Sequence, residues 1–185
     1  MDNQRLKVGV VGLGNMGKHH VRNYHEIESA DLVAVCDVHQ ENADHFSQKY
    51  NCQGYTDLKK MLSESGIEAV SITAPTRLHF EIAKDVIEAG VHVLIEKPIA
   101  DTLVQSQRIV DVTKEQDVHV VIGHHRRHSP FIQMAKSVVE NGELGKLVGA
   151  MMLWTLMKPA DYFDVNWRTT RPGGGPMLIN LIHEI

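Results

Sequence analysis

Three glycines near the N-terminus have the spacing of a turn that binds a dinucleotide. Gly12, Gly14 and Gly17 form a GxGxxG pattern between the first apolar run and the first amphipathic stretch. In that setting the first glycine permits a tight turn, the second lets a pyrophosphate approach the backbone, and the third lets the helix pack closely on the strand. The N–H groups at the start of the helix, near Asn15 and Met16, then point toward the anion.

A carboxylate follows the second apolar run at a matching distance. Asp37 lies 20 residues after Gly17, where a carboxylate accepts hydrogen bonds from the ribose diol of an adenosine. The next residues, Val38 and His39, provide no arginine for a 2′-phosphate, so the pattern favours NAD over NADP. Methyltransferases that use S-adenosylmethionine also combine a glycine-rich turn with an acidic residue after the second strand. These residues alone therefore leave the cofactor class open.

Two longer blocks narrow the choice. The stretch TAPTRLHFEIAKDVIEAGVHVLIEKPIA contains Glu96-Lys97-Pro98 near its end. The stretch WRTTRPGGGPMLINLIHEI contains His183 eight residues after its last glycine. Both blocks resemble the motifs of the glucose-fructose oxidoreductase / inositol dehydrogenase / MocA family, in the same order along the chain. The resemblance implies a Rossmann domain, a following α/β domain, and NAD(P)-dependent oxidation or reduction of pyranoses and cyclitols. It also implies cofactor contacts, at Thr73, Pro75, His79 and Glu96.

Lys97 is the active-site lysine by this resemblance, and its position supports the same role. A lysine at the carboxyl end of a parallel strand lies in the crevice where such sheets bind ligands. A cationic nicotinamide disfavours the ammonium form, so the neutral amine can accept a hydroxyl proton while hydride leaves the carbon. Glu96 can hold this lysine by a charge-assisted hydrogen bond, and Pro98 can bend the chain toward the site. The alternative is an ordinary Glu–Lys pair at a strand end.

The second block both matches the family and departs from it. His183 matches the histidine that helps the lysine handle the substrate proton, and imidazole suits that task near neutral pH. Ile179, however, stands where the family has an aspartate, four residues before His183. Asn180 can hydrogen-bond a substrate hydroxyl but cannot replace a carboxylate as a base. Three possibilities remain open: Lys97 and His183 suffice, the substrate is unusual, or the protein has lost ordinary dehydrogenase activity.

Other polar clusters suggest substrate contacts more than a metal. The group His124-His125-x-x-His128 has no cysteine or acid nearby, whereas zinc sites usually need four such ligands. We therefore predict no metal, and we expect Arg127 in this basic segment to contact a polyol or sugar substrate. The indole of Trp167 and the guanidinium of Arg168 suit the same substrate, as does Asn180.

These residues need a scaffold, and the apolar runs provide one. Each run is almost continuously apolar, as in a parallel sheet covered on both faces, and amphipathic stretches lie between the runs. The pattern predicts an α/β, doubly wound Rossmann domain over residues 1–122. Its expected strands are Leu6–Val11, Leu32–Cys36, Ala69–Ile72, Val91–Ile95 and His119–Ile122, and its expected helices are Asn15–Ile27, Gln40–Tyr50, Thr76–Ala89 and Leu103–Glu115.

Residues 123–185 predict the incomplete start of a second α/β domain. A basic turn leads into a helix that ends near Gly142 and Gly145, and Leu147–Met157 is expected to be a long strand of a second sheet. Its methionines and Trp154 are expected in the core of that sheet. The unpaired backbone of such a strand predicts association, so we expect a homo-oligomer.

The composition excludes several other classes. A net charge of −4 and a pI near 6.3 argue against a nucleic-acid partner. No apolar stretch reaches the roughly 18 residues that cross a bilayer, and the N-terminus lacks the pattern of a signal peptide. Cys36 and Cys52 form no CxxC pair and suit a reducing compartment. The expected protein is cytoplasmic, with NAD and a small polyol or sugar as partners. Two rival readings stay open: an NAD-binding sensor without turnover, and an NAD-assisted glycosidase.

Overall fold

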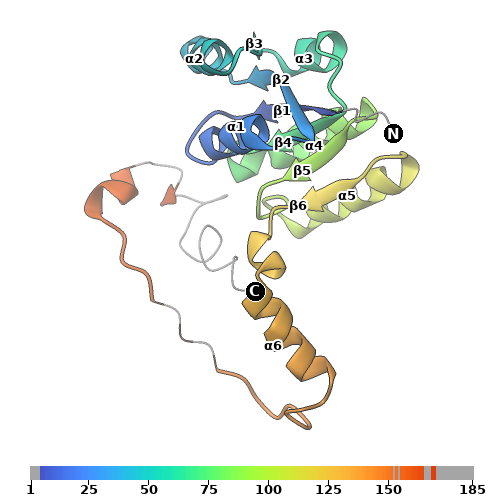
Figure 1. Cartoon of the computed structure of the whole chain (residues 1–185), viewed down its shortest axis with the longest axis vertical. Helices are drawn as coiled ribbons and strands as arrows, with labels where there is room; N and C mark the ends of the chain where they lie inside the picture. The colour runs from blue at the N-terminus through green and yellow to red at the C-terminus, as the bar shows by residue number, and fades with distance from the viewer. Residues whose placement is uncertain (1–4, 152, 154, 165–167, 170–185) are drawn as a thin grey trace. The chain divides into compact units, whose positions relative to one another are not determined.

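A computed structural model describes residues 5–151, 153, 155–164 and 168–169, and it divides the chain into two compact units, Met1–Gly123 and His124–Ile185. The first unit is a six-stranded sheet in the order β3-β2-β1-β4-β5-β6, with every neighbouring pair parallel (Figure 1). Its strands are β1 (Leu6–Val11), β2 (Ala30–Cys36), β3 (Gln53–Tyr55), β4 (Ala69–Ile72), β5 (His92–Ile95) and β6 (Val120–Ile122).

Helices cover both faces of this sheet, because alternate strand residues point to opposite sides and are apolar on both. On one face, Val8 and Val10 of β1 pack with Val21 of α1 (Gly17–Glu26) and Phe46 of α2 (Gln40–Tyr50). The other face packs against three helices, α3 (Leu58–Glu64), α4 (His79–Glu88) and α5 (Leu103–Glu115). The predicted doubly wound Rossmann architecture is therefore confirmed.

Side chains at the helix starts explain where two of these helices begin. Asp57 precedes α3 and accepts a hydrogen bond from the backbone N of Lys60 at 3.0 Å. Thr102 precedes α5 and accepts one from the backbone N of Gln105 at 3.2 Å. Such caps satisfy N–H groups that have no partner inside the helix.

The sequence prediction located five of the six strands and missed one strand and one helix. β1 and β4 have the predicted bounds, β2 begins two residues earlier than expected, and β5 and β6 each begin one residue later. β3 contains three residues and α3 contains seven, so both are too short to show a clear period.

The order of the strands determines where a ligand can bind. β1 has β2 on one side and β4 on the other, so the direction of winding reverses between β1 and β4. In open parallel sheets such a reversal leaves a crevice outside the carboxyl ends of the strands. Val11, the last residue of β1, pairs with Cys36 and with Ile72. The segments that follow these three strands therefore begin side by side.

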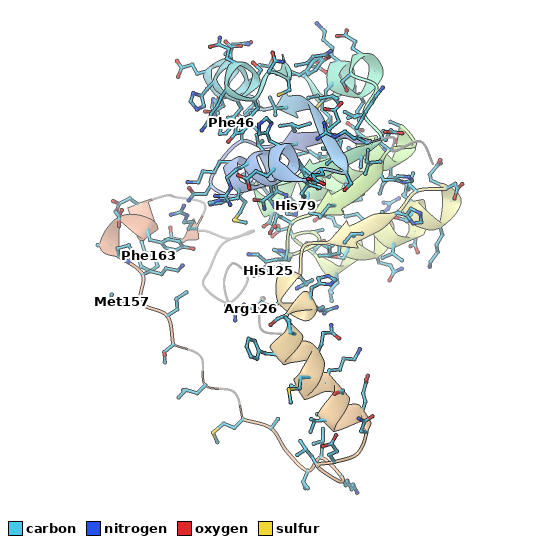
Figure 2. The ribbon with its side chains drawn as sticks, in the orientation of Figure 1. Phe46, His79, His125, Arg126, Met157 and Phe163 are labelled. Atoms are coloured by element: carbon cyan, nitrogen blue, oxygen red, sulfur yellow. The ribbon has the colours of Figure 1, made fainter. Side chains whose placement is uncertain are left out.

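The second unit contains one α-helix among its described residues. A 3₁₀ turn at His125–His128, where Figure 2 labels His125 and Arg126, precedes α6 (Pro130–Glu140). Proline suits the first position of a helix, because the N–H that it lacks would have no partner there. A second 3₁₀ turn spans Ala160–Asp164.

The predicted long strand at Leu147–Met157 is wrong for the positions that the structure describes. Residues 147–151, 153 and 155–157 form no strand, and Val148, Met151 and Met157 are each more than nine-tenths exposed. Met151 and Met157, which were expected in a sheet core, are therefore on the surface. Met152 and Trp154 lie outside the described residues. A strand exists only where a neighbour completes its hydrogen bonds, and apolar composition does not provide that neighbour.

Candidate cofactor and active site

Gly12 sits at a position that only glycine can occupy. Its φ is +90°, and a Cβ there would lie 2.6 Å from the backbone N of Ala74. The chain turns sharply at this point, and the backbone N of Gly12 donates to the carbonyl oxygen of Cys36 at 2.8 Å. The turn after β1 is thus packed directly against the loop after β4.

The other two glycines of the pattern differ in what surrounds them. A Cβ on Gly17 would lie 2.0 Å from the carbonyl oxygen of Gly12, so this glycine lets α1 begin against the turn. A Cβ on Gly14 would meet nothing within 4 Å, so the backbone there faces open space. Among the described residues no side chain caps α1 at Met16, and its first turn holds no acidic residue. Open backbone beside an uncapped helix start fits a pyrophosphate.

The pattern residues Asn15 and Met16 lie on the rim of this turn. Both are exposed, and the side-chain oxygen of Asn15 accepts a hydrogen bond from Lys18 Nζ at 3.1 Å. Their side chains point away from the packed interior, so the backbone of this segment is what the turn offers to an anion.

Asp37 lies beside the same turn. Its Oδ2 accepts a hydrogen bond from the backbone N of Leu13 at 2.7 Å, and its Oδ1 accepts one from the backbone N of His39 at 2.9 Å. An ionised carboxylate can accept about four hydrogen bonds, so half of its capacity remains for a ribose diol. The carboxylate therefore fits an adenosine ribose and also ties the end of β2 to the glycine turn.

Thr73 and Pro75 begin the loop after β4. The Thr73 hydroxyl donates to the carbonyl oxygen of Gly12 at 2.5 Å, and its backbone N donates to that of Val11 at 2.9 Å. Pro75 precedes the 3₁₀ turn at Thr76–Leu78 that leads into α4. Thr73 thus fixes the loop against the glycine turn, and Pro75 directs the chain away from it.

His79, labelled in Figure 2, is buried with 1% of its surface exposed. Both of its ring nitrogens contact backbone carbonyls. Nδ1 lies 2.9 Å from the oxygen of Pro98, and Nε2 lies 2.8 Å from that of Ala74. Burial lowers the pKa of His79, although these carbonyls and the charge of Glu96 act in the opposite direction. The imidazole joins the loop after β4 to the turn that carries Lys97.

Glu96 and Lys97 follow β5 directly, and a cis peptide bond joins Lys97 to Pro98. Glu96 is 9% exposed and its Oε1 lies 3.2 Å from Nε2 of His20 on α1. Burial alone would raise the pKa of Glu96, but the hydrogen bond and charge of His20, together with the charge of Lys97, hold that pKa below its ordinary value. Glu96 is therefore a buried carboxylate beside the predicted active lysine.

Sequence reasoning did not single out His20. The GKHH segment does not reveal its partners, because Ser71 and Glu96 lie 51 and 76 residues further along the chain. A histidine three residues after the last glycine of the pattern faces the sheet across the first turn of α1, and that spacing was the available signal.

Two of the predicted substrate residues lie in the described part of the second unit. Arg127 is exposed, and its carbonyl oxygen accepts a hydrogen bond from the side chain of Gln133. The guanidinium of Arg168 stacks on the ring of Tyr162 at 4.3 Å and donates to the Tyr162 carbonyl oxygen at 2.9 Å. Four other positions of interest lie outside the described residues: Trp167, Ile179, Asn180 and His183.

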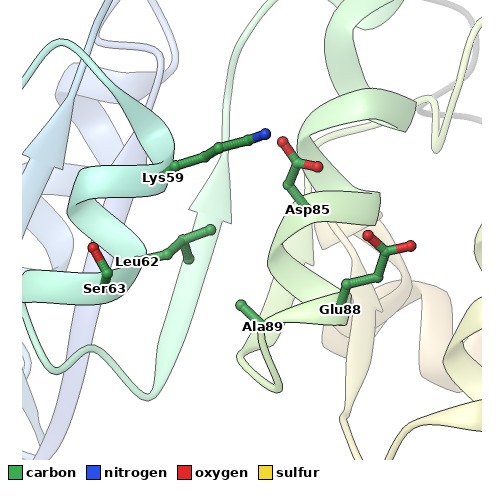
Figure 3. Close-up of a pocket in the computed structure, with 6 residues that line it drawn as sticks. All are labelled: Lys59, Leu62, Ser63, Asp85, Glu88 and Ala89. Atoms are coloured by element: carbon green, nitrogen blue, oxygen red, sulfur yellow. The ribbon is translucent and has the colours of Figure 1, made fainter.

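Among the described residues, no group of three His, Cys, Asp or Glu side chains is arranged to hold a metal ion. No helix in that part of the chain has the length and apolarity to cross a membrane. A pocket between α3 and the end of α4 is lined by Lys59, Leu62, Ser63, Asp85, Glu88 and Ala89 (Figure 3). It lies away from the glycine turn, because α4 starts at the carboxyl edge of the sheet and its last residues lead back toward the start of β5.

Known proteins share this arrangement. Residues 6–124 match the model of the GFO_IDH_MocA oxidoreductase family, NAD-binding Rossmann fold. Myo-inositol 2-dehydrogenase of Thermotoga maritima is 31% identical over 182 residues, which are 97% of this chain and 52% of that protein. The chain thus spans about half the length of the curated relatives it matches.

Two solved structures are similar as well. One is the WlbA dehydrogenase from Bordetella pertussis in complex with NADH and UDP-GlcNAcA, which superposes with a TM-score of 0.88 at 26% identity. The match covers 98% of this chain and 57% of the WlbA chain. The other is the scyllo-inositol dehydrogenase from Lactobacillus casei with bound NAD(H) and scyllo-inositol, which has a TM-score of 0.72 at 28% identity. This match covers 77% of this chain and 43% of the dehydrogenase chain. With the glycine turn, Asp37 and the Glu96-Lys97-Pro98 segment all at one edge of a parallel sheet, the chain belongs to the GFO_IDH_MocA family of oxidoreductases and contains its NAD-binding Rossmann domain.

Proposed function

We propose that this protein transfers hydride between NAD and a secondary alcohol of a sugar or cyclitol, with Lys97 as the acid–base group. One observation carries the proposal: the turn after β1, the carboxylate after β2 and the lysine after β5 all lie at the carboxyl edge of the parallel sheet. The relatives whose names specify inositol and nucleotide-sugar ligands support the substrate class.

Each residue then has a defined task. NAD, when bound, supplies the acceptor or donor of the hydride. The backbone near Gly14 binds the pyrophosphate, and Asp37 binds the adenosine ribose. Lys97 accepts the hydroxyl proton of the substrate at Nζ during oxidation and returns it during reduction. Glu96 holds a negative charge beside that amine.

The remaining assignments are proposals of the same kind. We propose that Arg127, Trp167, Arg168 and Asn180 contact the substrate and that His183 assists Lys97. Pro75 and His79 are proposed at the cofactor side of the cleft, where the contacts of His79 with Ala74 and Pro98 support an indirect role. Ile179, at the place where the family resemblance implies an aspartate, favours one alternative: a protein that binds NAD as a sensor without turnover.

Replacement of the lysine tests this function. Lys97→Ala is expected to lower turnover of a polyol by about 10²–10⁴-fold, the range typical of a general acid–base group, while NAD affinity stays near that of the parent. Lys84→Ala is a matched control, because Lys84 is an exposed lysine that pairs with Glu88 on α4. Turnover is measured by NADH absorbance over a panel of sugars and cyclitols, and affinity by calorimetry.

Two results would overturn the assignment. Full activity of Lys97→Ala would show that Lys97 is not the acid–base group of the reaction. A parent that binds NAD but oxidises no member of the panel would favour the sensor.

We also propose a homo-oligomer in the cytoplasm. The exposed apolar side chains of α6, Phe131, Ile132 and Met134, support association, and the unpaired thiols of Cys36 and Cys52 suit a reducing compartment. Light scattering and cell fractionation test the two statements. A monodisperse monomer would refute the first, and recovery outside the cytoplasmic fraction would refute the second.

A further inference from the structure

A chain of polar side chains runs through the interior beside the proposed active lysine. The hydroxyl oxygen of Tyr24 lies 2.7 Å from Ser71 Oγ, which lies 3.2 Å from Nδ1 of His20. On the other side of the ring, Nε2 of His20 lies 3.2 Å from Oε1 of Glu96. Ser71 and Glu96 are 1% and 9% exposed. These hydrogen-bonded side chains connect α1, β4 and the segment after β5.

The carboxylate fixes the direction of these hydrogen bonds. An ionised Glu96 only accepts, so Nε2 of His20 must carry the proton that lies between them. Neutral His20 then accepts at Nδ1 from the Ser71 hydroxyl, and Ser71 accepts from the Tyr24 hydroxyl. If His20 is protonated, the bond between His20 and Ser71 reverses, because Nδ1–H then donates to the Ser71 oxygen, and the donor to Glu96 remains. Glu96 keeps a hydrogen bond from His20 in both charge states.

Without this donor a buried carboxylate at this position would be costly. Burial of an unpaired charge favours the protonated acid, and His20 opposes that effect at Glu96. The other groups that face Glu96 are Lys97 in its own segment and His79 of α4, whose charges interact with it. After β6 the nearest residue is Gly123, where a Cβ would lie 3.0 Å from Glu96 Oε1. No side chain can therefore approach from Gly123 to replace His20.

We propose that His20, held in place by Ser71 and Tyr24, is a positioning residue that keeps Glu96 ionised and fixed beside Lys97. The consequence for catalysis rests on the proposed function, because it assumes that Lys97 handles the substrate proton. The geometry and the ionisation of Glu96 do not depend on that assumption. His20 acts on Lys97 through Glu96, whose Oε1 lies 3.2 Å from Nε2 of His20.

Titration of Glu96 by NMR tests the proposal on the 185-residue chain. The protein is labelled with ¹³C at glutamate carboxyl carbons, and the Glu96 signal is identified by its loss in Glu96→Gln. His20→Ala is expected to raise the pKa of Glu96 by about one pH unit, the effect of losing a close hydrogen bond to the charged form. His19→Ala is the matched control, since His19 is an exposed histidine on the same helix, and it is expected to leave the titration unchanged.

Two further measurements keep the test decisive. In the ¹⁵N spectrum of the parent, neutral His20 is expected with its proton on Nε2, and a proton on Nδ1 would overturn the proposal. Equal Glu96 pKa values in His20→Ala and His19→Ala would also overturn it. If His20→Ala does not fold, Tyr24→Phe decides: it removes only the outer hydroxyl, so a smaller rise of the same sign is expected, and no rise would overturn the proposal.

Turnover separates this inference from the proposed function. In a form of the protein that oxidises a polyol, the acidic limb of the kcat/KM profile is expected to move to higher pH in His20→Ala by the same shift as Glu96. An acidic limb that stays in place while the Glu96 pKa rises would overturn the catalytic consequence. Absence of turnover in the parent would count against the proposed function, and the Glu96 titration would still decide the role of His20.

Discussion

The contrast between Gly12 and Gly14 yields a prediction that separates folding from cofactor binding. Alanine at either position adds one methyl group to the same turn. At Gly12 the methyl carbon would lie 2.6 Å from a backbone nitrogen, whereas at Gly14 it would meet nothing within 4 Å. The two variants are therefore expected to fail in different ways.

The cost at position 12 has two parts. A φ of +90° is strained for any residue with a Cβ, at about 1–3 kcal/mol. The contact with Ala74 is with backbone and cannot be relieved by rotating a side chain, so overpacking adds about 1–3 kcal/mol. Gly12→Ala is thus expected to lower the free energy of unfolding by about 2–6 kcal/mol, a large share of the roughly 5–15 kcal/mol of a typical domain.

Position 14 is expected to behave in the opposite way. Gly14→Ala is expected to leave the free energy of unfolding within about 0.5 kcal/mol of the parent, because the methyl group enters open space. If a pyrophosphate occupies that space, NAD affinity falls at least about tenfold, which corresponds to about 1.4 kcal/mol.

Urea unfolding followed by circular dichroism measures the first quantity, and calorimetric titration with NAD measures the second. NAD binding equal to that of the parent in Gly14→Ala would refute the placement of the pyrophosphate at this turn. A fully stable Gly12→Ala would refute the claim that the turn is packed against Ala74 without room for a Cβ.

Three further predictions follow from the described contacts. Asp37→Ala is expected to weaken the binding of NAD and to reduce the difference between the NAD and NADP affinities, both measured by calorimetry. Tighter binding of NADP than of NAD by the parent would contradict this role of Asp37. Because burial lowers the pKa of His79 from 6.5, the unfolded chain gains a proton first, so the urea midpoint is expected to fall as pH drops below about 6.5. The lowered pKa of Glu96 adds a second loss of stability as the pH falls below its ordinary value of 4.5. A urea midpoint that stays constant from pH 7 down to about pH 3 would contradict both expectations. Burial raises the pKa of Cys36 to about 12 and that of Cys52 to about 11, so a thiol reagent at neutral pH is expected to react slowly with both and fastest after unfolding, and rapid labelling of the folded chain would contradict this.

The sequence predicted the parts of the fold that depend on long, repeated patterns. Buried strands such as β1 are almost continuously apolar, because helices cover both faces of the sheet. This pattern identifies each strand without knowledge of its neighbours in the sheet. α3 was missed although Asp57 marks its start and Leu58, Met61 and Leu62 follow at helical spacing. Seven residues are too few for that spacing to stand out.

The segment at Leu147–Met157 failed for a different reason. Composition measures how much apolar surface a segment has, but a strand also needs a neighbour with free backbone groups. The contacts of His20 were unpredictable for a related reason. Its partners come from β4 and from the end of β5, and no local pattern encodes a hydrogen bond across 76 residues.

The bonds around the glycine turn also determine when the site forms during folding. Leu13 is held by Asp37, 24 residues away, and Gly12 is held by Thr73, 61 residues away. Closing such loops has an entropic cost that later contacts must offset, so the turn reaches its final shape only after β4 has docked beside β1. On a ribosome, the growing chain would acquire affinity for NAD only after β4 has emerged and paired with β1. Bound NAD would then stabilise the assembled sheet by mass action, which makes the cofactor a late and selective aid to folding.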